Sequence, residues 1–197
     1  PMLHDGDGGR YLGTACIVVT KDPDSDWTNW GVYRQMVVNQ REMTTMLFPF
    51  SHGGMMFYRK YVPRKQPMPM AVAIGADPLS LWAAATAFRK GESEANYAGA
   101  LLQEPVDLVK CLTCDLMVPA TAEIVIEGEV LPDKEYPEGP FGEYPGYRMT
   151  LRQSRPVLKV KAITHRHDPI LTASCIGVPV DDAHVIEGIG AAMAFKR

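Results

Sequence analysis

The strongest constraint on the fold is a ten-residue segment, 122–131, in which apolar and acidic residues largely alternate. Successive side chains of a strand point to opposite faces of a sheet, so this alternation predicts a strand with one apolar and one acidic face. We expect its acidic residues, Glu123, Glu127 and Glu129, to lie at a sheet edge or on a solvated face. Because one strand cannot bury its apolar face alone, the sequence must supply partner strands.

Short β-branched or apolar segments between turn residues supply these partners. They predict strands at residues 12–20, 31–38, 43–48, 69–75, 106–111, 157–164 and 170–175. Helices are predicted at residues 55–62, 79–88, 93–102 and 183–195, with Asp77 and Ser93 as capping residues. Residues 132–145 are rich in Pro, Gly and acidic residues, which predicts a long loop. The pattern favours an α+β fold with a barrel-like sheet, and no composition shift divides the chain into domains.

Composition excludes several classes of protein and partner. The 197 residues are 46% hydrophobic, which suits one globular domain, and a formal charge of −3 leaves no basic stripe for nucleic acid. No apolar run approaches the roughly 18 residues that cross a bilayer, and residues 1–5 do not resemble a signal peptide. We expect a soluble, cytoplasmic protein. The chain does not begin with Met and its last predicted helix runs to the terminus, so we expect both ends to be truncated. The alternative at the C-terminus is a natural end, since Lys196 and Arg197 suit the dipole of a helix C-terminus.

Four cysteines are too few for a disulfide framework, so reduced thiols are expected. Cys111 and Cys114 have the CxxC spacing of a zinc or redox site. A zinc site of this kind needs a second ligand pair, and no CxxC or HxxxH follows in the sequence. A thioredoxin-like motif needs a helix that begins at the first cysteine. Because the flanking residues are typical of extended chain, the sequence favours two ordinary strand or turn cysteines.

Two carboxylates and one arginine are candidates for acid–base chemistry. Glu138 and Glu143 lie in the Pro- and Gly-rich loop, where they are either solvated turn residues or a rigid pair that divides acid and base roles. Arg34 lies in a predicted apolar strand, so its guanidinium must pair with an anion or face solvent on an amphipathic strand. Paired carboxylates can also serve as the acid and nucleophile of a glycosidase, but that function leaves Arg34 unexplained.

Asn29, His52 and Glu94 are candidates for a hard-cation site. An amide oxygen, an imidazole nitrogen and a carboxylate together suit Mg²⁺ or Mn²⁺. Each residue also has a simpler explanation, since His52 can cap or pack at a helix entrance and Glu94 is favoured by the dipole of its own helix. The three residues are 23 and 42 positions apart, so spacing alone does not show that they converge.

Ordered motifs along essentially the whole chain resemble those of the UbiD family of (de)carboxylases. The motifs are Asn29-x-x-x-x-Arg34-Gln35, Ser51-His52-x-Gly54, GADP at 75–78, SEANYAG at 93–99, EPVDLVKC at 104–111, VPATAEIV at 118–125 and EGPFGEYPGY at 138–147. The resemblance implies reversible, non-oxidative decarboxylation of an aromatic, heteroaromatic or α,β-unsaturated carboxylic acid. It also implies prenylated FMN as the cofactor, bound with Mn²⁺ or Mg²⁺ and with K⁺.

By position in these motifs, the resemblance assigns roles to individual residues. Those that match the catalytic Glu-Arg-Glu network of the family are Arg34, Glu138 and Glu143, with Glu143 as the proton donor. Those that match the residues binding the metal ion and bridging it to the cofactor phosphate are Asn29, His52 and Glu94. Those that match the flavin-lining segments are Val32, Tyr33, Arg34, Phe48, Pro49, Phe50, Ser51, Gly53 and Gly54.

Two details of the flavin site are also expected from the resemblance. The backbone amides of Gly53 and Gly54 are expected to approach flavin or phosphate oxygens. Residues 86–88 stand where relatives often carry a proline against the flavin, so the contacts with the cofactor are expected to differ there.

The same resemblance sets expectations for the fold and the partners. The matching family domain is a split β-barrel related to flavin reductases, and family members continue past it into a C-terminal domain. We therefore expect residues 1–197 to form a single prenyl-FMN-binding domain, with 183–197 leading towards a missing C-terminal domain. A UbiX-type flavin prenyltransferase supplies the cofactor in this family, and the full-length form is expected to be a homo-oligomer. The alternative is a catalytically silent flavin- or metal-binding module that requires the missing domain.

Overall fold

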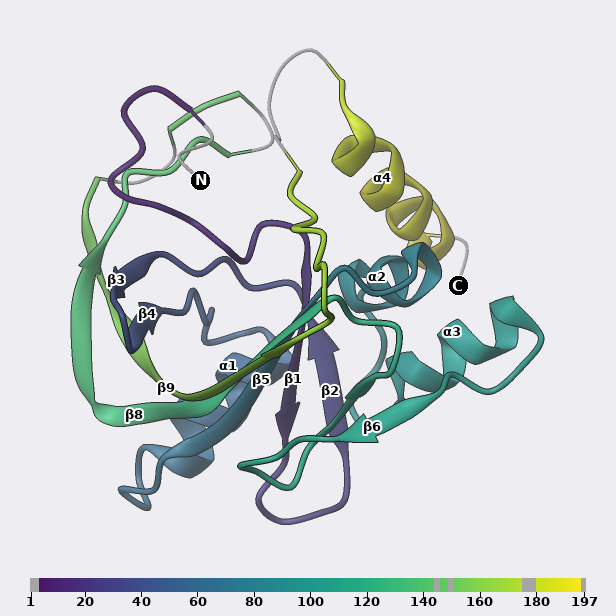
Figure 1. Ribbon diagram of the computed structural model, residues 1–197, viewed down its shortest axis with the longest axis horizontal. Helices are drawn as coiled ribbons and strands as arrows, with labels where there is room; N and C mark the ends of the chain where they lie inside the picture. Colours follow the sequence, from purple (N-terminus) through teal and green to yellow (C-terminus); the bar gives the residue numbers. More distant parts are fainter. Residues whose placement is uncertain (1–3, 144–145, 149–150, 175–179, 196–197) are drawn as a thin grey trace.

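The computed structural model describes residues 4–143, 146–148, 151–174 and 180–195. The strands are β1 (Cys16–Lys21), β2 (Thr28–Gly31), β3 (Val37–Asn39), β4 (Glu42–Thr44), β5 (Met68–Ile74), β6 (Leu108–Lys110), β7 (Met117–Pro119), β8 (Ile124–Glu138) and β9 (Gln153–His165). Seven of them form one antiparallel sheet in the order β2-β1-β5-β8-β9-β4-β3, and β6 pairs with β7 in a separate hairpin (Figure 1).

Capping side chains explain where the helices begin. The helical elements are α1 (His52–Met56), the π-helical segment η1 (Phe57–Tyr61), α2 (Pro78–Ala85), α3 (Glu94–Leu102) and α4 (Asp182–Phe195). Asp77 Oδ1 accepts a hydrogen bond from Ser80 N at 2.9 Å, and Ser93 Oγ accepts one from Asn96 N at 3.3 Å, so both predicted caps are confirmed. Within the described ranges, every helix is too short or too polar to cross a lipid bilayer.

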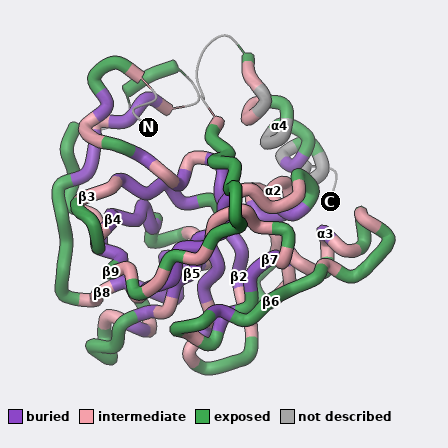
Figure 2. The backbone as a smooth tube through the Cα atoms, viewed as in Figure 1, coloured by how far each residue is buried: buried purple, intermediate pink, exposed green. Residues whose placement is uncertain are grey.

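The central strands are buried on both faces, which explains their continuously apolar sequence. In β1, Val18 packs in one cluster with Phe57 of η1, whereas its neighbour Val19 packs in a second cluster with Ala84 of α2 and Val118 of β7. Figure 2 shows the buried positions concentrated in these central strands. One face of the sheet is therefore covered by α1 and η1, and the other by α2 and the β6–β7 hairpin.

Most predicted elements are confirmed, with ends that shift by a few residues. The predicted strand 31–38 is wrong at its centre, because residues 32–36 connect β2 to β3. In that connection Arg34 O accepts from Met46 N and Gln35 O accepts from Leu12 N, so the backbone bonds to two different neighbours and not to one strand. The strand predicted at 170–175 is wrong for residues 170–174, which are not in a strand, and Cys175 lies outside the described residues.

The predicted loop 132–145 is wrong in its first half, since β8 continues to Glu138. The pairing of β8 with β9 shifts register between Val130 and Glu135, around Pro132, which cannot donate a backbone hydrogen bond. Pairing then resumes as far as Glu138, so this residue ends a paired strand. The last two residues of the predicted loop lie outside the described part of the chain.

The acidic face of β8 also departs from expectation. Glu123 and Glu129 are partly exposed, but Glu127 is only 2% exposed. The turn of the β6–β7 hairpin covers it, because Leu112 N and Thr113 N both donate hydrogen bonds to its carboxylate. The expected solvated position is therefore wrong for Glu127.

The α+β prediction is confirmed, since the helices are added to one dominant antiparallel sheet. Among the described residues, hydrogen bonds do not close this sheet, and β2 and β3 are its edge strands. The split β-barrel therefore stays a prediction.

We expect Gly128→Ala to destabilise the domain by about 1–3 kcal/mol, the usual cost of overpacking. A Cβ on Gly128 would overlap the backbone oxygen of Lys159 where β8 and β9 shift register. Gly188→Ala is the matched control, because Gly188 is an exposed residue of α4 with open space around its Cβ position. That change should stabilise the helix by about 0.5–1 kcal/mol. Urea unfolding midpoints test both changes, and equal midpoints for the two variants would contradict the packing argument.

Candidate active site

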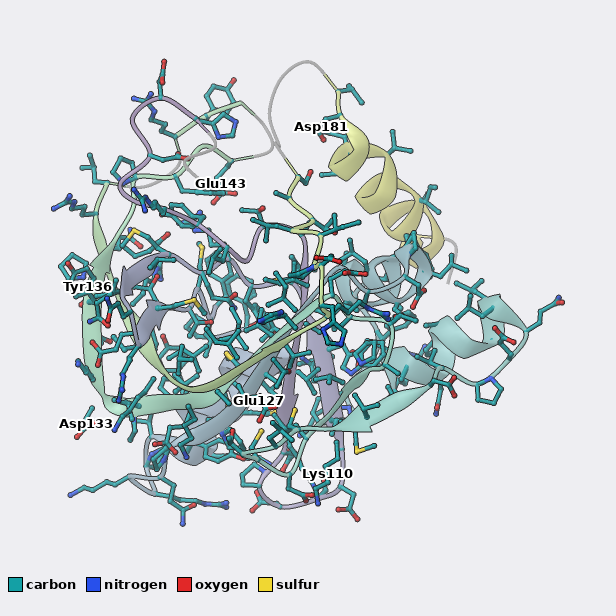
Figure 3. The ribbon with its side chains drawn as sticks, in the orientation of Figure 1. Lys110, Glu127, Asp133, Tyr136, Glu143 and Asp181 are labelled. Carbon is teal, nitrogen blue, oxygen red and sulfur yellow. The ribbon has the colours of Figure 1, made fainter. Side chains whose placement is uncertain are left out.

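One cavity, of about 860 Å³, brings together elements that are far apart in the sequence. Its walls come from β2 and the segment after it, the segment between β4 and α1, the end of α2 and the start of α3. The loop after β8 contributes Glu143, which Figure 3 labels. The predicted residues Asn29, Arg34, His52 and Glu94 line the same cavity.

Arg34 is the centre of a buried ion-pair network. Its Nε and Nη2 donate to Glu138 Oε1 and Oε2 at 2.9 and 3.0 Å, a bidentate geometry that strengthens the pair. Its Nη1 donates to Glu143 Oε1. Arg34 is 8% exposed and Glu138 is 1% exposed, so the guanidinium charge is neutralised away from bulk water. The three side chains of the predicted network are in contact, and the alternatives of a surface-facing arginine and of a solvated Glu138 are wrong.

Two aromatic side chains support the buried part of this network. Tyr11 is fully buried, and its hydroxyl donates to Glu138 Oε1 at 2.6 Å. The Phe141 ring packs against the guanidinium, with Arg34 Cζ 4.6 Å from the ring centroid. Burial, followed by the hydrogen bond to Glu138, raises the pKa of Tyr11, so its hydroxyl keeps its proton at physiological pH.

The N-terminal segment holds the loop after β8 in place. Gly8 N donates to Pro140 O at 2.7 Å, and Gly142 N donates to Asp7 Oδ1 at 3.0 Å. A Cβ on Gly8 would overlap the backbone oxygen of Gly139, so glycine is required for this close approach. The position of this loop therefore depends on Asp7 and Gly8 as well as on β8.

Asn29 and His52 are in contact on the cavity wall. Asn29, on β2, places its Oδ1 3.1 Å from Nδ1 of His52, the first residue of α1. When the imidazole proton is on Nε2, the lone pairs of Nδ1 and of Asn29 Oδ1 are close enough to bind one cation together. Burial, and to a smaller extent the charge of Lys90, lowers the pKa of His52 and favours the neutral imidazole that binds metal ions.

Glu94 reaches the same cavity from the first turn of α3. It is 2% exposed, its Oε2 accepts a hydrogen bond from Trp30 N at 3.0 Å, and burial raises its pKa to about 7. Among the described residues, no basic side chain forms an ion pair with this carboxylate. A buried carboxylate that lacks such a partner fits a bound cation, and the nitrogen and oxygen donors of His52 and Asn29 suit the same kind of ion.

The residues predicted to bind the flavin fall into two groups. Those that line the cavity are Val32, Tyr33, Arg34, Phe48, Phe50 and Ser51. Those that do not line it are Pro49, Gly53 and Gly54. The rings of Phe48 and Phe50 stack with their centroids 5.1 Å apart, and both side chains are exposed, so they form an aromatic surface where the cavity meets solvent.

The amides of the two glycines in α1 are used within the protein. Gly53 N donates to Tyr33 Oη and Gly54 N donates to Ser51 Oγ, each at 3.1 Å. A Cβ on Gly54 would overlap the backbone oxygen of Phe48. The close approach that these glycines permit is therefore made by other parts of the chain, which differs from the expected approach of flavin or phosphate oxygens.

Several residues of the site were not singled out from the sequence. Tyr11 contacts Glu138 across 127 positions, and no local pattern marks it. Gln153 and Arg155 line the cavity because β9 begins earlier than predicted and stays paired with the end of β8. No strand signal marks them in the sequence, because residues 152–155 are all polar and Pro156 follows. The divergent residues 86–88 also line the cavity.

Comparisons with known proteins identify the family of this chain. Residues 1–179 match the family model described as UbiD, 3-octaprenyl-4-hydroxybenzoate carboxy-lyase Rift-related domain. The chain is 40% identical over 188 residues to a pyrrole-2-carboxylic acid decarboxylase of Pseudomonas aeruginosa. It is 36% identical over 190 residues to ferulic acid decarboxylase 1 of Saccharomyces cerevisiae. Each of these matches covers 95% of this chain but only 38% of the relative, so the chain spans little more than a third of their length.

A solved structure shows the same backbone arrangement. It is an evolved dimeric form of the UbiD-class enzyme HmfF from Pelotomaculum thermopropionicum in complex with prFMN, and it is 40% identical to this chain. The TM-score is 0.87, and the match covers 95% of this chain and 42% of the other. The sequence, the site and these comparisons together show that the chain belongs to the UbiD family.

Proposed function

We propose that this domain holds prenylated FMN and a divalent metal ion for a reversible, non-oxidative decarboxylation. The proposed substrate is an aromatic, heteroaromatic or α,β-unsaturated carboxylic acid. The observation that carries the proposal is that the Arg34 network and the set of Asn29, His52 and Glu94 converge on one cavity. The matched relatives are named as decarboxylases and a similar structure holds prFMN, which supports the same chemistry here.

Arg34 and its two carboxylates are suited to handle a carboxylic acid substrate. When bound, the prenylated flavin supplies the electron sink for the negative charge that loss of CO₂ leaves on the substrate carbon. The positive charge of Arg34 attracts the substrate carboxylate and holds it beside the acidic loop. Glu138 offsets that charge from behind, since it is buried and bonded to both Arg34 and Tyr11.

Glu143 is the proposed proton donor. Its side chain is 19% exposed and lines the cavity, unlike the enclosed Glu138. Because Glu138 balances the charge of Arg34, Glu143 can carry a proton when the substrate carboxylate lies beside it. The bond between the substrate carbon and its carboxylate carbon breaks, CO₂ leaves, and the remaining electron pair takes the proton of the Glu143 carboxyl group. Arg34 then stabilises the Glu143 carboxylate until solvent returns a proton, and the reverse transfer serves carboxylation.

The metal site is proposed from the donors on the cavity wall. Asn29 Oδ1, His52 Nδ1 and a Glu94 oxygen would hold Mn²⁺ or Mg²⁺, with the cofactor phosphate and water as further ligands. The ion would take the place of the hydrogen bond between Asn29 and His52. The ion would balance the charge of the phosphate and keep Glu94 ionised despite its burial. K⁺ is proposed from the family resemblance, without an assigned residue.

The fold and partners follow the same resemblance. We propose that the curved sheet (Figure 1) is a split β-barrel of the flavin-binding type and that the chain forms a single cofactor domain. In the whole protein a C-terminal domain would follow α4. A UbiX-type flavin prenyltransferase would supply the cofactor to a cytoplasmic homo-oligomer.

A second candidate is a flavin- and metal-binding module that turns over only with further domains. The observation that favours it is that the chain covers 38% of each curated relative. Reconstitution with prenylated FMN and Mn²⁺, followed by flavin absorbance and CO₂ release with an unsaturated carboxylic acid, separates the two. Bound flavin with CO₂ release supports the decarboxylase, and bound flavin without it supports the module. Failure to bind either flavin or Mn²⁺ contradicts both.

We predict that Glu143→Gln lowers decarboxylation by about 10²–10⁴-fold while flavin stays bound, because the amide keeps the shape but cannot donate the proton. CO₂ release and flavin absorbance on the same reconstituted sample measure the two effects. The matched control is Glu135→Gln, which changes an exposed glutamate of β8 and should leave both values unchanged. Full activity of the Glu143→Gln protein would rule out the proposed donor.

We predict that His52→Ala and Glu94→Gln each lose the divalent ion and weaken flavin binding, because each removes a proposed ligand from the cavity wall. Elemental analysis after dialysis against Mn²⁺ gives the metal content, and flavin absorbance gives cofactor occupancy. Glu104→Gln, at an exposed position just after α3, should retain both. Unchanged metal content in the two ligand variants would refute the assignment.

A further inference from the structure

The turn of the β6–β7 hairpin holds two thiols against a carboxylate of the main sheet. Cys111 directly follows β6, Cys114 lies three residues later, and Glu127 comes from β8. The two Sγ atoms and a carboxylate oxygen all lie within 4.8 Å of one another. No other three His, Cys, Asp or Glu side chains in the described ranges gather ligand atoms this closely. Glu127 and Glu143 are well separated in Figure 3, so this cluster is distinct from the candidate active site.

The carboxylate of Glu127 is buried and anchored. Leu112 N donates to its Oε1 at 2.9 Å, and Thr113 donates to its Oε2 through N at 2.7 Å and through Oγ1 at 2.8 Å. A carboxylate offers about four acceptor positions, so these three bonds leave capacity for a further ligand, chiefly on Oε1. Among the described residues, no basic side chain forms an ion pair with Glu127. The group is therefore held in place beside the thiols without a cationic partner.

The chemistry of this donor set selects the ion. Two thiolates and one carboxylate are ligands of Zn²⁺, whereas Mg²⁺ and Ca²⁺ prefer oxygen alone. The remaining acid in the turn, Asp115, is paired with Lys21 at 3.3 Å and with Lys110 at 3.1 Å. Cys114 is only partly buried, and Leu112, which follows Cys111, is exposed, so an ion and a water molecule can enter from solvent.

We propose that Cys111, Cys114 and Glu127 form a Zn²⁺ site in which two thiolates and one carboxylate oxygen bind the ion and water fills the fourth position. Binding releases the two thiol protons to solvent and changes no oxidation state. The ion links the β6–β7 hairpin to β8. Such a link has a structural purpose, because a two-stranded hairpin is only marginally stable by itself and all three residues of β6 are exposed.

Cobalt titration of the whole chain tests this site. Co²⁺ added to the reduced, metal-free protein should give tetrahedral visible bands and a near-ultraviolet thiolate-to-metal charge-transfer band that saturate together, and Zn²⁺ should abolish both. Only sulfur ligands produce the charge-transfer band, so metal at Asn29, His52 and Glu94 does not contribute. The His52→Ala protein should therefore keep the band, whatever the outcome for the proposed decarboxylase.

Variants identify the ligands. Cys111→Ser and Cys114→Ser should each lose the charge-transfer band, whereas Cys175→Ser, which removes a cysteine elsewhere in the sequence, should keep it. Glu127→Gln should weaken Zn²⁺ binding by about tenfold or more. Zn²⁺ should raise the thermal midpoint of the wild-type chain but not that of either serine variant.

The wild-type titration decides the proposal even if a variant fails to fold. Absence of the charge-transfer band in the reduced wild-type chain, or weak octahedral spectra alone, would overturn the site. Persistence of the band in both serine variants would do the same. Unchanged Zn²⁺ affinity in the Glu127→Gln protein would remove the carboxylate from the ligand set.

Discussion

A buried guanidinium is stable only when carboxylates neutralise it, and this requirement organises the domain. Arg34 is bonded to Glu138 and Glu143, which lie 104 and 109 positions further along the chain. To bring these carboxylates to Arg34, β8 must stay paired with β9 beyond Pro132, and the N-terminal segment must pack on the loop that follows β8. Loss of Glu138 would break the buried bidentate pair, at a cost of about 3–5 kcal/mol. One side chain thus constrains three distant segments.

The sheet provides the rigid support for this arrangement. β1 and β5 are buried on both faces, whereas the candidate site residues come from its margins. Asn29 lies on the edge strand β2, Arg34 lies in the irregular connection to β3, and Glu138 ends β8. Side chains at strand ends and connections can face a cavity without disrupting the core, because the core is made by other strands.

Local features of the fold could be predicted from the sequence because their causes are local. Asp77 and Ser93 cap the helices that follow them, and the apolar run of β5 marks a strand wherever it packs. The burial of Glu127 could not be predicted from alternation, since alternation assigns a residue to a face but does not say what covers that face. The β6–β7 hairpin, which covers it, comes from another part of the chain.

In the candidate site, too, residue types could be predicted from the sequence, whereas contacts between distant residues could not. Asn29, His52 and Glu94 could be named as donors from their residue types and from family motifs, but their separation along the chain gave no reason for them to converge. Tyr11 carried no signal at all, because its hydrogen bond to Glu138 exists only in the folded chain. Pro132 favoured a loop by its local chemistry, and the strand continues past it because pairing with β9 outweighs that preference.

The contacts around Arg34 join residues that are far apart in the sequence, and this separation affects the order of folding. Neighbouring strands such as β3 and β4 close a short turn, whereas the bonds of Glu138 to Arg34 and Tyr11 close loops of 104 and 127 residues. Longer loops cost more entropy to close, so these bonds are expected to form after the sheet has assembled. A partly folded chain can then possess most of its strands and still lack the charged wall of the cavity. A ligand that needs this wall selects the fully folded chain and shifts the folding equilibrium towards it.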